Sequence, residues 1–141
     1  MTIPFWCLFI LIFFPYTLSN LGGYIRIKTF GKYDNKQPRA QAALLDGTGA
    51  RVYAAQQNLW ESIIIFSMAV FVAHFSGADV EKSALAAIIF MVMRVIHAGA
   101  YLLDQDIIRS LAFSVGYGCC IWLFVLAIQA ASIQGNYKPT L

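Results

Sequence analysis

The sequence has few charged residues, and this shortage excludes an ordinary soluble domain. Only 12% of the 141 residues are Asp, Glu, Lys or Arg, whereas soluble domains average about 25%. The hydrophobic share is correspondingly high, at 60%. We therefore expect an integral membrane protein, with the lipid bilayer as its solvent, that forms a single domain over residues 1–141.

Cysteine is also scarce, and this excludes two further classes of protein. The three cysteines, Cys7, Cys119 and Cys120, all lie in apolar runs. An odd count with two adjacent residues does not make a disulfide framework, and no cysteine–histidine spacing predicts a metal site. We expect buried thiols and no metal. A net charge of +3 without a long basic face gives no indication of a nucleic-acid partner.

Hydropathy predicts four membrane-spanning helices, each near the roughly 20 residues that a bilayer requires. They run from about 3 to 24, 52 to 76, 84 to 103 and 108 to 133. A signal peptide is the alternative for the first span, but no basic stretch precedes it and no clean cleavage site follows. Pro15 should kink that span. The expected fold class is therefore all-α, an integral membrane four-helix bundle.

The connections between the spans are unequal. Residues 25–51 are predicted to form one long polar loop, and residues 77–83 and 104–107 to form tight turns. Five cations lie early in the long loop: Arg26, Lys28, Lys32, Lys36 and Arg39. The positive-inside rule places this loop in the cytoplasm. Both termini then lie on the outer side.

Two charged residues, Glu61 and Arg94, fall inside predicted spans. A charge near the bilayer centre costs about 3 kcal/mol on insertion scales, so such residues usually face the bundle interior and have a partner. One interpretation is a structural ion pair that holds the helices together. The other is a functional site within the membrane, and the two do not exclude each other.

Further polar residues share a face with these charges. Arg51, Asn58 and Glu61 lie on the second predicted helix, Arg94, His97 and Tyr101 on the third, and Arg109 and Ser110 at the start of the fourth. Each has a simpler explanation when taken singly: a helix–helix hydrogen bond for Asn58, a satisfied helix-end residue for His97, an interfacial aromatic for Tyr101 and a juxtamembrane cation for Arg109. Together, the polar stripes predict one shared site.

The predicted depth of these residues indicates what the site would bind. Arg26, Arg51, Tyr101 and Arg109 fall near the cytoplasmic ends of their spans, and Asn58, Glu61, Arg94 and His97 one to three turns deeper. This arrangement predicts a cationic funnel that opens to the cytoplasm and closes on a polar floor. Such a funnel would suit a small anionic ligand with carboxylates.

Four blocks of sequence carry a family signature. They are GYIR at residues 23–26, RVYAAQQNLWE at 51–61, RVIHAGAY at 94–101 and RSLAF at 109–113. The second block resembles the R…RAxxNxxE signature of the MAPEG family, the membrane-associated proteins in eicosanoid and glutathione metabolism. The third resembles the family's RxxHxxxY helix, the fourth its arginine-led last helix and the first the end of its first helix. The resemblance spans almost the whole chain.

The resemblance implies a homotrimer that holds glutathione, a co-substrate, between neighbouring subunits. It implies that Arg109 stabilises the glutathione thiolate, to which Ser110 could donate a hydrogen bond. The residues implied to bind glutathione are Arg26, Arg51, Asn58, Glu61, Arg94, His97 and Tyr101. An adjacent guanidinium favours the thiolate of a thiol that is mostly protonated at neutral pH. The other arginines would hold the carboxylates of glutathione, and Glu61 its amino group or an arginine.

The chain also departs from the family pattern. Ala54 stands where the family usually has arginine, Gln56 and Gln57 occupy positions that are often basic, and Phe113 replaces a common tyrosine. The 104–107 turn is one residue shorter than in the prostaglandin synthase branch. These departures disfavour eicosanoid synthesis. They favour a bacterial-type microsomal glutathione transferase-like protein in the bacterial inner membrane.

The expected function is therefore glutathione transferase or peroxidase-like chemistry, in which glutathione is conjugated to lipophilic electrophiles that partition from the bilayer. One alternative is a non-catalytic MAPEG-fold protein that binds ligands or acts as a scaffold, because Ala54 and Phe113 replace groups that relatives use. A second alternative is a small four-helix transporter in which Glu61 couples proton movement.

Overall fold

The computed structural model describes residues 1–136, and this part of the chain is helical without a strand. The helices are α1 (Ile3–Leu11), α2 (Phe14–Phe30), α3 (Pro38–Ala43), α4 (Gly47–Phe75), α5 (Val80–Leu102) and α6 (Asp106–Asn136). Four helical stretches are long and apolar enough to cross a membrane: Ile3–Phe30, Gly47–Phe75, Val80–Leu102 and Asp106–Ile133. The predicted all-α membrane bundle with four spans is confirmed.

The first span is broken rather than continuous. Helix α1 ends at Leu11 and α2 begins at Phe14, with Pro15 in the first turn of α2. Proline fits a first helical turn because the backbone N–H that it lacks has no partner there. The kink predicted at this residue therefore takes the form of two helices in one span.

The polar segment predicted as a loop over residues 25–51 is shorter than expected. Helix α2 continues to Phe30 and α4 already begins at Gly47, so that only residues 31–46 connect them, and α3 lies within this connection. Gly31 ends α2 with a left-handed backbone, at φ 75°, which glycine adopts without steric cost. The loop was predicted from hydropathy, which shows where the chain becomes polar and not where a helix ends. Both α2 and α4 continue into the polar segment.

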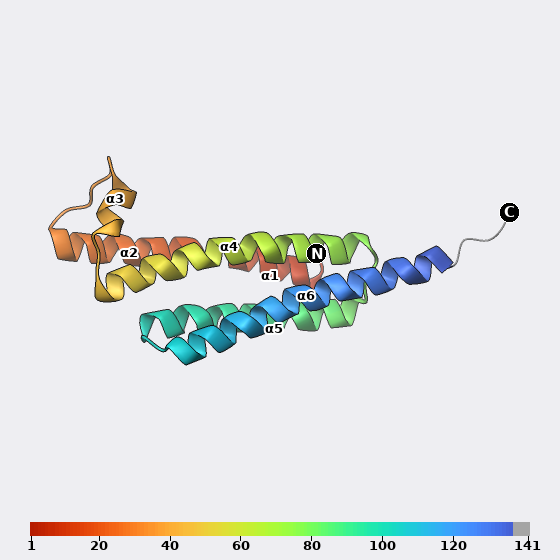
Figure 1. The fold of residues 1–141 in the computed structure, drawn as a ribbon. Helices are drawn as coiled ribbons and strands as arrows, with labels where there is room; N and C mark the ends of the chain where they lie inside the picture. Colours follow the sequence, from red (N-terminus) through yellow and green to blue (C-terminus); the bar gives the residue numbers. More distant parts are fainter. Residues whose placement is uncertain (137–141) are drawn as a thin grey trace.

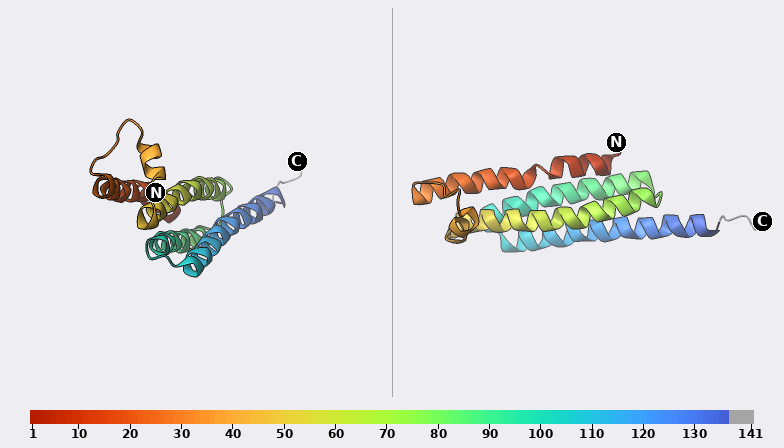
Figure 2. Two further views of the ribbon diagram at one scale, coloured as in Figure 1. Left: turned by 60° about the vertical axis from the view of Figure 1, so that its left-hand side comes forward. Right: turned by 90° about the horizontal axis from the view of Figure 1, so that it is seen from above.

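Helix α4 is the central element of the bundle. Helix α2 packs against α4 but makes no contact with α5 or α6, whereas α5 and α6 pack against each other and against α4. Figures 1 and 2 show the four long helical stretches lying roughly along one common direction, with the short α3 at an angle to them. The segment with α3 and the α5–α6 turn lie at one end of the bundle, and the α4–α5 turn lies at the other (Figure 1).

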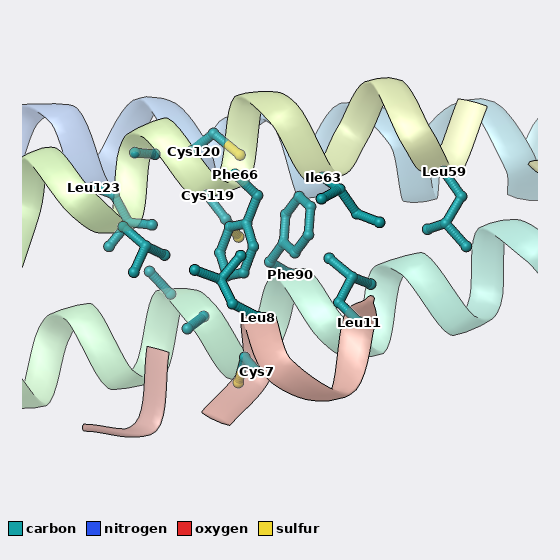
Figure 3. Packing of buried hydrophobic residues seen from close by; sticks show 14 of the residues in the cluster. Cys7, Leu8, Leu11, Leu59, Ile63, Phe66, Phe90, Cys119, Cys120 and Leu123 are labelled. Atoms are coloured by element: carbon teal, nitrogen blue, oxygen red, sulfur yellow. The ribbon is translucent and has the colours of Figure 1, made fainter. Parts of the chain in front are cut away.

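Two stacked aromatic rings form the centre of the core. The rings of Phe66 from α4 and Phe90 from α5 lie with their centroids 3.9 Å apart and their planes 6° from parallel. Aliphatic side chains of α1, α4 and α6 surround them: Leu8, Leu11, Ile63 and Leu123 (Figure 3). The three cysteines, Cys7, Cys119 and Cys120, are buried in the same cluster and carry free thiols, as predicted.

We predict that Phe66→Ala destabilises the bundle by about 3 kcal/mol, because the substitution opens a cavity that the stacked Phe90 cannot fill. Phe75→Ala is the matched control, because the Phe75 side chain at the end of α4 is 80% exposed. Unfolding in mixed detergent micelles, followed by helix content, measures both variants. Equal midpoints for the two variants would contradict a core centred on this stack.

Candidate functional site

Arg94 is a charged residue held entirely inside the bundle. Its side chain is 2% exposed. The guanidinium donates from Nη1 to Ser62 Oγ, 2.8 Å away in α4, and from Nη2 to the carbonyl oxygens of Ala112 and Phe113 in α6, at 3.2 and 3.4 Å. One side chain of α5 therefore joins the three helices that form this half of the bundle.

The guanidinium of Arg94 fits because α6 has a glycine beside it. A Cβ atom on Gly116 would overlap Arg94 Nη2. The rings of Phe90 and Phe113 lie over the guanidinium carbon, with their centroids 5.1 and 5.7 Å away. Two aromatic faces and the missing side chain thus shape a pocket for a cation that has no acidic partner.

The interpretation that Glu61 and Arg94 form a structural ion pair is wrong. Glu61 is exposed, and within residues 1–133 the one ion pair joins Arg51 to Asp104. The reason is helical geometry: successive residues point about 100° apart, so Ser62 faces the interior and Glu61 does not. The two terminal nitrogens of Arg94 donate to neutral oxygens, whereas its Nε is buried without an acceptor among the described residues.

A chain of ring and cation contacts continues from Arg94 toward the α5–α6 turn. The His97 ring lies edge-on to Tyr101 at 5.1 Å and 6.1 Å from the Phe113 ring. The guanidinium carbon of Arg109 lies 4.8 Å from the Tyr101 ring centroid. We call Arg94, His97, Tyr101, Arg109 and Phe113 the α5–α6 cluster. The structure thus brings together four residues that the sequence placed in the site.

Asn58 and Arg51 lie on α4 beside this cluster. Asn58 is one turn before Ser62, and its Oδ1 atom is buried without a hydrogen-bond donor among the described residues. Arg51 donates to Asp104 Oδ2 at 3.3 Å and to Thr48 Oγ1 at 3.1 Å. The first of these bonds ties the start of α4 to the α5–α6 turn.

Arg109 differs from the other arginines of the predicted site. Arg26, Arg51 and Arg94 each donate hydrogen bonds to oxygens of the chain. The Arg109 guanidinium makes none with residues 1–133, although it is half-buried against Tyr101. Its N–H donors are therefore available to a ligand. Ser110, the neighbouring residue, is exposed and donates its hydroxyl proton to the Asp106 carbonyl at 2.9 Å.

Arg26 lies apart from the α5–α6 cluster, on the far side of α4. Its Nη1 atom donates to the Pro38 carbonyl at 2.7 Å, and its guanidinium lies 4.4 Å from the Tyr33 ring. The residue lines a polar cavity of about 380 Å³ between α2, α3 and α4, together with Gln56 and Gln57. The described lining of this cavity includes no residue of α5 or α6, so Arg26 and Arg109 do not share it within one chain.

Comparison with protein families decides the identity of the fold. The model of the MAPEG family matches residues 3–129. The chain belongs to the MAPEG family. A comparison with curated proteins gives no match. The family match covers the four spans up to residue 129 and agrees with the four sequence blocks, so the protein is an integral multi-pass membrane protein of this family.

The departures from the MAPEG pattern also have places in the structure. Phe113 lies with its ring over the Arg94 guanidinium and stacks on Tyr117 at 6.3 Å. Its ring lacks the hydroxyl that a tyrosine would bring one turn after Arg109. Ala54 lies two turns before Glu61 in α4, where the short side chain brings no charge to that face.

Sequence reasoning missed the partners of the arginines in this MAPEG protein. Ser62 accepts from Arg94, Asp104 pairs with Arg51, and Tyr33 covers Arg26. Two of them left a signal: Ser62 lies four residues after Asn58 and so shares its helix face, and Asp104 falls at the same predicted end as Arg51. Gly116 gave no signal, because its role depends on where Arg94 points.

We predict that Gly116→Ala lowers the stability of the protein by about 2 kcal/mol, because the added methyl group displaces the Arg94 guanidinium. Gly118→Ala is the matched control two residues away, where a Cβ atom meets nothing within 4 Å. Because alanine is the better helix former, the control should be neutral or slightly stabilising. Thermal unfolding in detergent measures the difference, and the same loss in both variants would contradict the role of Gly116.

Proposed function

We propose that this protein is a membrane-bound glutathione transferase that conjugates glutathione to lipophilic electrophiles, with Arg109 stabilising the thiolate. The observation that carries the proposal is the free set of donors on Arg109. Arg26, Arg51 and Arg94 are hydrogen-bonded within the chain, whereas the Arg109 guanidinium makes no hydrogen bond with residues 1–133. Membership of the MAPEG family supports the same function.

The proposed chemistry needs one charge in the right place. A cysteine thiol has a pKa of about 8.5, and only its deprotonated form attacks an electrophile efficiently. A guanidinium beside the sulfur favours loss of the thiol proton, and the first turn of α6, where Arg109 lies, adds the favourable end of the helix dipole. The thiol proton passes to water, and the thiolate forms a carbon–sulfur bond with an electrophile that arrives from the bilayer; with an aryl halide the carbon–halogen bond breaks and halide leaves.

We place glutathione between neighbouring subunits of a homotrimer. Arg26 and Arg109 lie on opposite sides of α4 in one chain. One tripeptide can touch both only if each arginine belongs to a different subunit. The exposed Glu61 and the unpartnered Asn58 oxygen on α4 would then accept hydrogen bonds from the same ligand or from the neighbouring subunit.

We also propose that the end of the bundle with α3 faces the cytoplasm of a bacterial cell, with the protein in the inner membrane and both termini outside. Four exposed cations lie at this end: Lys28, Lys32, Lys36 and Arg39. The positive-inside rule assigns such an end to the cytoplasm. Glutathione, a water-soluble co-substrate, would reach the site from that side.

A second candidate function is a non-catalytic MAPEG-fold protein that binds a ligand or acts as a scaffold. The internal bonding of three arginines favours it, since those side chains are already engaged. The lack of a hydroxyl on Phe113 and of a charge on Ala54 favours it as well. This candidate predicts no glutathione-dependent turnover with any electrophile or lipid hydroperoxide.

We predict that glutathione added to the purified protein gives the ultraviolet absorbance of a thiolate and that Arg109→Ala abolishes this absorbance. Turnover with a lipophilic aryl halide should fall by about 100-fold, the usual cost of removing one donor to a developing anion. Arg109→Lys should retain part of the signal, because it keeps the charge.

The control is Lys82→Ala, which removes an exposed cation at the other end of the bundle and should leave absorbance and turnover unchanged. Unchanged absorbance and turnover in Arg109→Ala would refute the mechanism. No thiolate and no turnover in the wild-type protein would favour the non-catalytic candidate.

We predict that a site shared between subunits can be rebuilt from two defective variants. Arg26→Gln keeps a donor for the Pro38 carbonyl but removes the charge, and Arg109→Ala removes the thiolate partner. If each site takes one arginine from each neighbour, random mixing of the two variants leaves roughly a quarter of the interfaces intact. Thiolate absorbance per subunit measures this fraction.

The comparison is a mixture of wild-type subunits with the double variant. A shared site again leaves roughly a quarter of the sites intact, whereas a site within one subunit leaves about half of them. A site within one subunit would also leave none intact in the mixture of single variants. That pair of results would exclude the location between subunits and would leave the role of Arg109 to the preceding experiment.

A further inference from the structure

A second cavity lies at the opposite end of the bundle from Arg109. It has a volume of about 220 Å³ and sits beside the α4–α5 turn, between the start of α1 and helices α4, α5 and α6. Most of the lining is apolar and comes from Pro4, Val70, Ala73, Ala78, Val80 and Leu123. An aliphatic cavity of about 150 Å³ suffices to take up benzene, so this one can hold a small apolar molecule.

The lining includes a buried hydroxyl that has no partner among the described residues. Ser83 lies in the first turns of α5 and is 7% exposed. Its backbone N–H donates to the Asp79 carbonyl at 3.0 Å, but its Oγ atom is buried without a hydrogen bond among the described residues. Burying a hydroxyl without a partner is unfavourable, because the group loses its hydrogen bonds to water. A ligand oxygen in the cavity would remove that cost.

The surroundings of Ser83 select against a charged ligand. The N-terminus of α5 could attract an anion, but the Asp79 side chain already accepts from the Lys82 N–H at 2.8 Å, and Glu81 lies in the same turn. These two carboxylates beside the N-terminus of α5 repel an anion there. The apolar walls give a cation no acidic partner inside the cavity, and the ring of the lining residue His74 packs edge-on against Phe5 at 4.9 Å. A neutral oxygen acceptor on an apolar chain fits all of these features.

We propose that this cavity binds an uncharged, medium-chain carbonyl amphiphile, with its chain among the apolar side chains and its carbonyl oxygen accepting from Ser83 Oγ. The site is distinct from the proposed thiolate site. Leu123 and Arg109 lie fourteen residues apart on α6, which is about 21 Å along the helix. The ligand would therefore not react where it binds, and the proposal does not depend on glutathione chemistry.

The probe is a medium-chain methyl ketone with a diazirine in its chain, applied to the full-length protein in nanodiscs. Irradiation followed by peptide mapping should show saturable labelling at residues 70–83 and beside Leu123. Unlabelled methyl hexyl ketone should compete, and n-octane, which lacks the oxygen, should compete more weakly. Labelling spread over the lipid-facing surface without saturation would overturn the proposal.

Two variants test the contribution of the Ser83 hydroxyl and that of the cavity volume separately. Ser83→Ala should weaken competition by methyl hexyl ketone about fivefold, the worth of one hydrogen bond, and leave competition by n-octane unchanged. Ala73→Leu should fill the cavity and abolish the saturable labelling itself. The control is Ser67→Ala, because the Ser67 hydroxyl already donates to the Ile63 carbonyl at 2.6 Å. Equal ketone competition in Ser83→Ala and wild type would refute the role of Ser83, whether or not Ala73→Leu folds.

Discussion

The hydrogen bonds of Arg94 are the interaction on which this bundle depends. A guanidinium inside the membrane must find oxygen acceptors within the protein, because lipid chains offer none. Ser62 on α4 and two carbonyl groups of α6 provide them, and Gly116 leaves the necessary space. Between apolar helices in lipid there is no hydrophobic driving force, so hydrogen bonds and close packing fix their arrangement. Arg94 thus sets the register of α4, α5 and α6, and with it the position of the cluster that ends at Arg109.

Because Arg94 has this structural role, the polar residues of the site fall into two groups: those that position the site and those whose donors are free to bind a ligand. An arginine with three internal hydrogen bonds is a positioning group, because any ligand that drew it away would open the bundle. Arg51 has a similar role near the start of α4, where Asp104 holds it. The α5–α6 cluster is therefore built on a fixed base, with one cation, Arg109, whose donors remain unused within the described chain. Preorganised donors of this kind favour an anion without first breaking other bonds.

The sequence predicted the four spans and the grouping of polar residues well, for a clear physical reason. Long apolar runs form membrane-spanning helices in a bilayer, and residues three or four apart in a helix share one face. That is why Arg94, His97 and Tyr101 were placed together correctly. The predicted ion pair between Glu61 and Arg94 is wrong because Glu61 and Ser62 are adjacent in the helix. The pattern of apolar residues does not show which of the two faces inward. The separation of Arg26 from Arg109 depends on which helices touch, and periodicity does not contain that information.

The contacts within a single chain do not explain why the Glu61 carboxylate lies exposed within a membrane span. It lies near the middle of α4, is exposed and forms no ion pair within the described chain. A carboxylate that faced lipid at that depth would cost about 3 kcal/mol, and no ion pair with the described residues offsets that cost. The carboxylate therefore requires a polar group from outside the chain. In the proposed homotrimer, a neighbouring subunit with bound glutathione would supply one, so the exposure of Glu61 and the separation of Arg26 from Arg109 both favour the proposal of a site completed between subunits.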